Sequence, residues 1–174
     1  GTGAIIGRHM DKVAAEAAQV QNAKVEEVTD ANGLSLPVLE NLAAQLAQLR
    51  TVDGTPPELT LTTNGTLLTD EIVTYLNDNR VMLVLSLDGS KKTHDHMRPY
   101  PGHLGSFDKA VEGFKKVIES RRGRNYYLRG TYTHYNPHFA DDVLAMLEVG
   151  SEISMEPVVG TNEPYVLTED DWQI

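Results

Sequence analysis

The sequence of 174 residues contains no cysteine. Disulfides, thiolate zinc sites, cysteine nucleophiles and cysteine-ligated iron–sulfur clusters are therefore excluded within this chain. No apolar run approaches the roughly 18 residues that a membrane-spanning helix needs. The first residues, 1–6, are too few and too uncharged to form a signal peptide. These absences predict a cytoplasmic protein that does not cross a membrane.

Positive charge is scarce as well. The chain has 15 lysines and arginines against 25 acidic residues, which gives a formal net charge of −10. This balance argues against a protein that binds the phosphate backbone of nucleic acid, because such binding requires a basic face. One basic cluster occurs at residues 121–124. We interpret it as a solvated helix end, favoured by the helix dipole, rather than as a binding site.

Residues 59–89 are the stretch around which the rest of the chain is organised. A β-rich run stops at Asn64, Thr69 opens a helix, and a second apolar strand at 82–87 ends before Asp88. This is one β-α-β unit. In parallel α/β folds, ligands bind at the carboxyl ends of the strands. The functional rim is therefore expected where these two strands end.

The remaining pattern continues the alternation. Helices are predicted at 10–21, 35–49, 106–118 and 136–149, a weak strand at 24–29, strands at 126–133 and 152–159, and a long polar loop at 90–105. This order predicts an α/β fold with a parallel sheet and right-handed crossovers, either a barrel or an open doubly wound sheet. Neither the GxGxxG nor the P-loop nucleotide fingerprint is present.

The last predicted helix follows Asn136, with Pro137 at its first position. Its buried face is expected to consist of Phe139, Val143, Leu144 and Leu147. Residues 1–160 are expected to form one domain, and residues 161–174 an acidic, irregular connecting tail.

Polar side chains close two neighbouring strands of the central unit. Thr62, Thr63 and Asn64 end the first strand, and Ser86 and Asp88 end the second. Their hydroxyl, amide and carboxylate groups suit a ribose or an amino-acid head group. Asn-Gly and Asp-Gly are also common turn pairs, so simple turn formation is the alternative interpretation. Both interpretations remain open at this rim.

Arg129 lies in the middle of a predicted strand, between apolar and aromatic neighbours. An unpaired charge is costly in such a place, so the guanidinium needs a carboxylate partner. That partner is either Glu156 on the next strand or the carboxylate of a ligand. Because guanidinium groups bind carboxylates bidentately, ligand recognition is the favoured hypothesis.

A polar group follows the second strand of the central unit. His94, Asp95, His96 and Arg98 lie close together in the sequence, and a His-x-His pair can chelate a metal. A metal site needs further ligands on rigid elements, and none is evident here. A segment that caps the next helix or contacts substrate is the preferred interpretation.

Five segments occur in the order LTTNGTLLTDEIVTYLN, LVLSLDGSKKTHDHMRP, GSFDKAVEGFKKV, YYLRGTYTHYNPHFADDVL and ISMEPVV. Together they resemble the barrel of radical S-adenosylmethionine (SAM) enzymes of the SPASM type. Maturases that install thioether cross-links in six-cysteine (SCIFF) peptides are the most similar, and the resemblance covers about residues 58–165. It implies a partial (β/α)6 barrel, SAM and a [4Fe–4S] cluster as cofactors, and a peptide substrate.

The resemblance also implies roles at the ends of the barrel strands. The residues are Thr62, Thr63 and Asn64 after the third strand, Ser86 and Asp88 after the fourth, Arg129 on the fifth, and Val158 and Val159 after the sixth. Arg129 would hold the methionyl carboxylate of SAM. The pair after the fourth strand would contact the ribose and the peptide site, and the two valines would lie near the adenine.

The sequence departs from the family at its reactive centre. The family's CxxxCxxC motif has no counterpart in these 174 residues, and we expect none for its first strand or its cysteine-rich SPASM domain within them. The Gly-Gly-Glu-Pro segment of the family falls near residues 30–33, where only Asp30 offers a carboxylate. We therefore expect an incomplete barrel of five strands. Its open edge would be covered by residues 4–6, by a partner or by another copy of the chain.

The expected function is that of the SAM-binding barrel portion of a radical SAM peptide maturase that forms thioether cross-links. Without thiolates the cluster cannot assemble in the family's way, so this chain is expected to be inactive by itself. The alternative is a non-catalytic module, derived from such a barrel, that binds a peptide or SAM. An ordinary barrel lyase or isomerase, which needs a poised acid–base pair, is a less favoured hypothesis.

Overall fold

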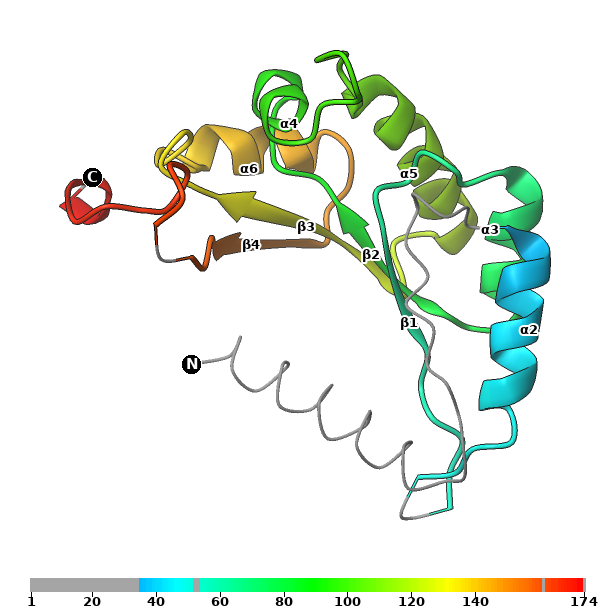
Figure 1. Cartoon of the computed structure of the whole chain (residues 1–174). Helices are drawn as coiled ribbons and strands as arrows, with labels where there is room; N and C mark the ends of the chain where they lie inside the picture. Colours follow the sequence, from blue (N-terminus) through cyan, green and yellow to red (C-terminus); the bar gives the residue numbers. More distant parts are fainter. Residues whose placement is uncertain (1–34, 52–53, 161, 174) are drawn as a thin grey trace.

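The computed structural model describes residues 35–51, 54–160 and 162–173, and its centre is a parallel sheet (Figure 1). The strands are β1 (Thr60–Thr63), β2 (Met82–Ser86), β3 (Tyr126–Tyr132) and β4 (Ile153–Pro157), paired in that order. The helices are α2 (Leu36–Leu46), α3 (Asp70–Asp78), α4 (Lys91–Met97), α5 (Phe107–Arg121), α6 (Ala140–Leu147) and the short 3-10 helix η2 (Asp170–Gln173). The predicted α/β architecture with a parallel sheet is confirmed.

The helices gather on one face of the sheet. Figure 1 shows α3, α4, α5 and α6 along that face, whereas no helix of the described ranges covers the opposite face. Leu83, Leu85 and Leu128 point from the strands into a core with Phe114 and Val117 of α5, and all five are fully buried. Burial of one such side chain contributes about 1.5–3 kcal/mol, so this layer holds the helices onto the sheet.

The helix α3 begins where its sequence predicts. The Oγ1 atom of Thr69 accepts a hydrogen bond from the Ile72 amide at 3.2 Å, which satisfies one of the free N–H groups of the first turn. Asp70 and Glu71 follow in that turn, where the helix dipole favours negative charge. The central β-α-β unit is therefore built from the local signals that the sequence carries.

The turn between β1 and α3 requires glycine at position 65. Gly65 has φ of +80°, and a Cβ atom there would lie 2.3 Å from the ring of Phe114. The Oγ1 atom of Thr63 accepts from the Gly65 amide at 3.0 Å. The Oδ1 atom of Asn64 accepts from the amide and hydroxyl of Thr66 at 3.0 and 2.8 Å. The Asn-Gly pair thus forms a turn that packs closely onto α5.

The segment 90–105 is not a long loop, because α4 occupies its first half. The Oγ atom of Ser90 accepts from the Thr93 amide at 3.4 Å, at the start of this helix. His94 is 1% exposed and meets the ring of Phe107 edge-on at 5.8 Å between centroids. The loop prediction was wrong because α4 buries a single side chain, an imidazole, and therefore has no apolar periodicity.

The helix after β3 starts later than predicted. It begins at Ala140, with Phe139 at the N-cap, rather than at Pro137. Asn136, the expected cap, instead accepts hydrogen bonds from the amide and hydroxyl of Thr133, both at 2.8 Å. Its side-chain oxygen therefore closes the turn after β3 and does not cap the backbone of the helix.

The face that α6 buries is also different from its prediction. Asp142 and Met146 are its buried residues, whereas Leu144 and Leu147 are 62% and 49% exposed. Hydrogen bonds to Asp142 from the segment after β2 fix the rotation of this helix, as described below. A polar anchor of this kind cannot be read from the spacing of apolar residues.

The described residues contain four strands, against the five that were expected. The predicted helix at 10–21 and the predicted strand at 24–29 lie outside the described residues, as do residues 4–6 and Asp30. Each of the four strands lies within two residues of its predicted bounds. None of the described helices is long and apolar enough to cross a lipid bilayer.

Candidate functional site

Polar side chains of β3 and β4 lie level with Ser86, the last residue of β2. Ser86 is in register with Arg129, and Arg129 with Ser154, while Glu156 lies two residues further along β4. Alternate residues of a strand point to opposite faces, and the intervening leucines of β2 and β3 enter the helix-side core. The row of Ser86, Arg129, Ser154 and Glu156, the polar row below, therefore lies on the face that carries no described helix.

Arg129 forms an ion pair within the polar row. Its Nη2 atom donates to Oε2 of Glu156 at 2.6 Å, and the two side chains are 38% and 34% exposed. The hydroxyl of Ser154 donates to Oε1 of Glu156 at 3.3 Å. The structure thus contains the internal partner that the sequence left open. Nε and Nη1 of Arg129 have no partner among the described residues, so the guanidinium keeps donors for a second carboxylate.

Asp88, which follows β2, is buried to 2% exposure. Its Oδ2 accepts from Nε of Arg98 at 2.5 Å, and its Oδ1 accepts from Nη2 of Arg98 at 3.2 Å and from the Thr131 amide at 3.0 Å. Both carboxylate oxygens are therefore engaged by the protein. Asp88 thus joins the end of β2 to Arg98, which follows α4, and to Thr131 of β3. Contact between Asp88 and a ribose stays a prediction.

The polar segment after β2 caps the next helix. The Nδ1 atom of His94 accepts from the Asp88 amide at 3.3 Å, and burial lowers the pKa of His94, so its imidazole is neutral. Oδ1 of Asp95 accepts from the Phe107 amide at 2.8 Å at the start of α5. Burial opposes the ionised form of Asp95, but this hydrogen bond and Lys91, 3.3 Å away, more than offset it, and its pKa is lowered.

The predicted site residues around β1 separate onto two faces. Thr62 is exposed and, because side chains alternate, lies on the same face as the polar row. Thr63 is 2% exposed and points toward the helices, and Asn64 is engaged in the turn described above. Turn formation therefore accounts for the hydrogen bonds that Thr63 and Asn64 make there, and Thr62 is the one of the three that shares a face with the polar row.

The two predicted valines follow β4 at the same rim. The Val158 amide donates to the Tyr132 carbonyl at 2.9 Å, which extends the pairing of β4 with β3. Val159 is 94% exposed. An exposed valine beyond the last strand is placed where an apolar ring could cover it, but its contact with adenine stays a prediction.

The carboxylate of Asp142 on α6 was missed by the sequence reasoning. It is 5% exposed and accepts hydrogen bonds from the Ser90 amide at 2.9 Å, the Thr93 hydroxyl at 2.8 Å and the Asn136 amide group at 3.1 Å. Gly89 makes room for it, since a Cβ at that position would lie 2.3 Å from the Asp142 side chain. Asp142 thus couples the loops that follow β2 and β3.

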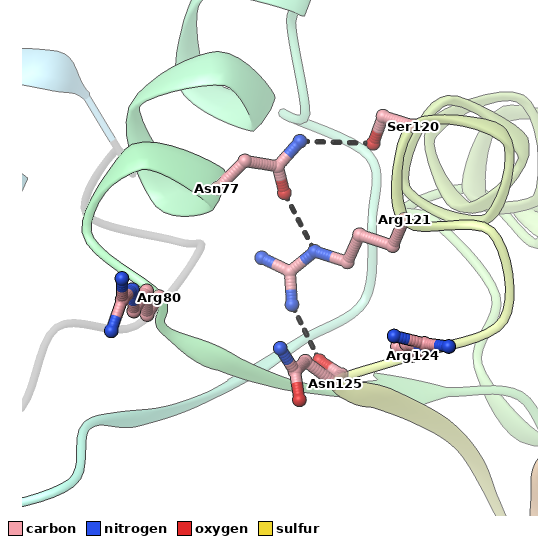
Figure 2. A pocket seen from close by; sticks show the side chains of 6 residues that line it. All are labelled: Asn77, Arg80, Ser120, Arg121, Arg124 and Asn125. Atoms are coloured by element: carbon pink, nitrogen blue, oxygen red, sulfur yellow. Dashed lines mark hydrogen bonds between the residues drawn. The ribbon is translucent and has the colours of Figure 1, made fainter.

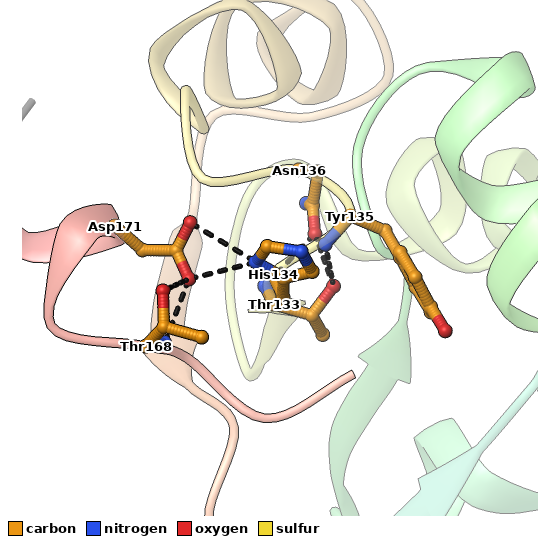
Figure 3. Close-up of polar contacts among 6 residues, drawn as sticks. All are labelled: Thr133, His134, Tyr135, Asn136, Thr168 and Asp171. Carbon is orange, nitrogen blue, oxygen red and sulfur yellow. Dashed lines mark hydrogen bonds and ion pairs between the residues drawn. The ribbon is translucent and has the colours of Figure 1, made fainter. Parts of the chain in front are cut away.

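A second contact that the sequence reasoning missed joins the C-terminal tail to the segment that follows β3. Figure 3 shows Nδ1 of His134 facing the carboxylate of Asp171, with distances of 2.9 Å to Oδ2 and 3.2 Å to Oδ1. Oδ2 of Asp171 also accepts from the Thr168 amide at 2.7 Å and from its hydroxyl at 2.8 Å. The amide of Thr168, followed by His134, lowers the pKa of Asp171 to about 2. The Thr-x-x-Asp spacing of Thr168 and Asp171 is a helix-capping signature, and it was the sequence signal that could have predicted the bonds between these two residues.

No group of three or more histidine, cysteine, aspartate or glutamate side chains in the described ranges is arranged to hold a metal ion. No protein-family model and no curated protein sequence matches the chain. Solved structures do match it. Native anSMEcpe with bound AdoMet and Kp18Cys peptide aligns with TM-score 0.65 and 18% identity, over 79% of this chain and 40% of that one. Native anSMEcpe with bound AdoMet and Cp18Cys peptide gives TM-score 0.67 at the same identity and coverage.

The described fold is similar to that of a radical SAM enzyme. A third structure, native anSMEcpe with bound AdoMet, aligns with TM-score 0.66, also at 18% identity. The resemblance inferred from the five sequence segments is thereby confirmed at the level of the fold. The chain spans about 40% of the length of the structures it matches.

Proposed function

We propose that this chain is the SAM-binding barrel portion of a radical SAM enzyme that forms thioether cross-links in a peptide. One observation carries the proposal: Arg129 lies level with the carboxyl end of β2, on the face of the sheet that no described helix covers, in a fold similar to AdoMet-bound structures. Carboxyl ends of parallel strands are where such folds bind ligands. The peptide-bound neighbours support a peptide as the substrate class.

The polar row would hold the methionyl and ribose groups of SAM. Nε and Nη1 of Arg129 would bind the methionyl carboxylate as a charge-assisted pair, while Glu156 keeps the guanidinium in position. Ser86, beside Arg129 in register, would meet the ribose together with Thr62. Val158 and Val159 would meet the adenine. SAM, when bound, would supply a sulfonium group whose bond to the 5′ carbon is open to one-electron reduction, by an electron that this chain's own residues do not provide.

The iron–sulfur cluster of the family does not fit the residues of this chain. Three thiolates are needed to hold a [4Fe–4S] cluster in that family, and the sequence contains no cysteine. This chain therefore supplies SAM binding and substrate positioning, and no reductive step is assigned to it. By itself it is proposed to be inactive. A partner or a second copy beside an outer strand, β1 or β4, belongs to the same proposal.

A non-catalytic module that binds a peptide or SAM is the alternative function. Its support is the same absence of cysteine, together with the ion pair that already neutralises Arg129 through Glu156. In such a module the rim would recognise a carboxylate or an extended peptide without any later chemistry. The two functions share the rim and differ in whether a cluster is ever delivered to it.

Calorimetric titration with SAM tests the shared pocket. The parent chain is expected to bind, and Arg129→Ala is expected to weaken binding at least about tenfold, the effect of one lost charge-assisted pair. Arg122→Ala is the control, because Arg122 is an exposed arginine just beyond α5, at the other end of the strands. A parent that does not bind SAM, or equal weakening in both variants, contradicts the proposal. Anaerobic reconstitution that gives the absorbance of a [4Fe–4S] cluster on this chain contradicts its inactivity.

A further inference from the structure

A basic pocket lies at the end of the sheet opposite to the rim. It has a volume of about 210 Å³ and is lined by Asn77, Arg80, Ser120, Arg121, Arg124 and Asn125. These residues come from the C-terminal ends of α3 and α5 and from the segment that leads into β3, as Figure 2 shows. Three of the six side chains are guanidinium groups, and no carboxylate lines the pocket. This excess of positive over negative side chains is unusual in a chain with a net charge of −10.

Arg121 is the fixed member of this pocket. Its Nε donates to Oδ1 of Asn77 at 2.7 Å, and its Nη1 donates to the carbonyls of Val81 at 2.8 Å and Asn125 at 2.5 Å. Asn77 is held in turn by a hydrogen bond from its amide group to the Ser120 hydroxyl at 3.0 Å. These contacts hold the guanidinium in one orientation (Figure 2).

The remaining nitrogen of Arg121 has no acceptor. Within the described ranges, Nη2 of Arg121 is the one buried side-chain nitrogen or oxygen without a hydrogen-bond partner. Burial lowers the pKa of Arg121, yet an arginine remains protonated in proteins, so a positive charge stays here with a donor unused. Buried polar groups normally have partners, and an orphaned charged donor is destabilising.

The ends of α3 and α5 explain only part of this arrangement. The negative end of the helix dipole favours basic residues there, and this accounts for Arg80 and Arg124 as solvated neighbours. It does not account for a buried guanidinium nitrogen without an acceptor, or for a pocket with no acidic residue in its lining. An anion supplied from outside would satisfy both features.

We propose that this pocket binds a small oxyanion of the phosphate class, at a site separate from the SAM rim. Guanidinium groups present paired donors that match phosphate oxygens, and the side-chain amide of Asn125 adds a neutral donor beside them. The volume is smaller than that of typical pockets for whole cofactors, which suits a phosphate group alone. Because Nη2 of Arg121 is buried, its contact with a bound oxygen requires an outward shift of the Arg121 side chain.

Titration of the full chain with inorganic phosphate tests this inference, with total ionic strength held constant by chloride because screening alone alters charged contacts. The double variant R80A/R124A removes the two exposed arginines that line the pocket and leaves Arg121 and its structural bonds intact. Arg122→Ala is the matched control, because this arginine belongs to the same sequence cluster but does not line the pocket. Melting temperatures of all variants verify that they are folded.

The parent and Arg122→Ala are expected to bind phosphate with the same dissociation constant, and the double variant is expected to bind at least about tenfold more weakly. Sulfate should compete and acetate should not. Binding of methyl phosphate as tightly as inorganic phosphate would assign the site to a terminal phosphate group of a larger ligand.

Three results would overturn the inference: no saturable binding in the millimolar range, equal weakening of phosphate binding in Arg122→Ala, or competition by acetate. SAM binding by the same double variant is expected to be unchanged, so the two sites are judged separately.

Discussion

Asp88 carries a negative charge into the protein interior at the end of β2, and Arg98 and the Thr131 amide compensate for it. We predict that Asp88→Asn lowers the free energy of unfolding by about 1–3 kcal/mol, because the amide keeps the shape but loses the charge-assisted bonds. Arg98 is 40% exposed, so its own charge can return to water and the loss stays moderate. Urea denaturation measures the change.

Asp108→Asn is the control for that measurement. The Asp108 carboxylate lies 2.6 Å from Nζ of Lys91, but its side chain is 80% exposed, so its removal should change stability by less than about 0.5 kcal/mol. Equal losses in the two variants would show that burial of Asp88 has no energetic consequence.

Asp171 is expected to make the docking of the tail dependent on pH. Its pKa is lowered from 3.8 to about 2 in the folded protein. The stabilisation of the docked tail by the ionised Asp171 is therefore complete above about pH 4 and is lost as the pH falls through 2. Trp172, the single tryptophan of the chain, lies next to Asp171 with its ring 6.4 Å from that of Tyr132, and its fluorescence reports on docking. The emission should change as the pH is lowered from 4 to 2.

Asp171→Asn provides the internal test of that assignment. The amide cannot form the ion pair with His134, so the emission of Trp172 near pH 6 should already resemble that of the acidified parent. If the variant has the parent's emission at pH 6 and the same acid transition, the Asp171 contacts do not hold the tail.

At the scale of elements, the β1–α3 turn packs closely against α5 because Gly65 has no side chain. Gly65→Ala is expected to lower stability in two ways: the positive φ disfavours alanine by about 1–2 kcal/mol, and the new methyl group overlaps the Phe114 ring, which adds about 1–3 kcal/mol. Gly123→Ala separates the two effects. Gly123 has the same φ of +80°, but a Cβ there meets nothing within 4 Å. Denaturant unfolding of both variants measures the difference, and equal destabilisation would contradict the packing role of Gly65.

Elements with their own start signals or apolar periodicity were predictable from the sequence. The Thr69 cap gave the beginning of α3, and Phe114 and Val117 gave the buried face of α5. In contrast, α4 and α6 are fixed by buried polar side chains, His94 and Asp142, whose partners lie in other elements. Hydrogen bonds of buried polar side chains leave no periodic trace in the sequence, and this is why both helices were misjudged.

The candidate site was predictable to a similar extent. Parallel alternation correctly set Arg129 beside Ser86, whereas the ligand site that the rule of carboxyl-end sites places there stays a prediction. The engagement of Asp88 by Arg98 was not predicted, because it depends on how α4 folds back. The contact between His134 and Asp171 joins residues 37 positions apart, and only the folded tail brings them together.

At the scale of the whole molecule, the two ends of the sheet carry different chemistry. The carboxyl rim combines hydroxyl groups with the half-buried pair of Arg129 and Glu156, whereas the opposite end gathers arginines around the orphaned nitrogen of Arg121. The first arrangement suits a zwitterionic ligand and the second an oxyanion. Two ligands bound at opposite ends should therefore not compete with each other.

The central claim is that Arg129 holds the methionyl carboxylate of SAM, and a comparison of SAM with decarboxylated SAM tests it most directly. Dissociation constants are measured for both ligands on the parent and on Arg129→Ala. The parent is expected to bind SAM at least about tenfold more tightly than the decarboxylated ligand, and Arg129→Ala is expected to bind the two almost equally. If the parent does not distinguish the two ligands, or if the preference persists in Arg129→Ala, Arg129 does not bind that carboxylate.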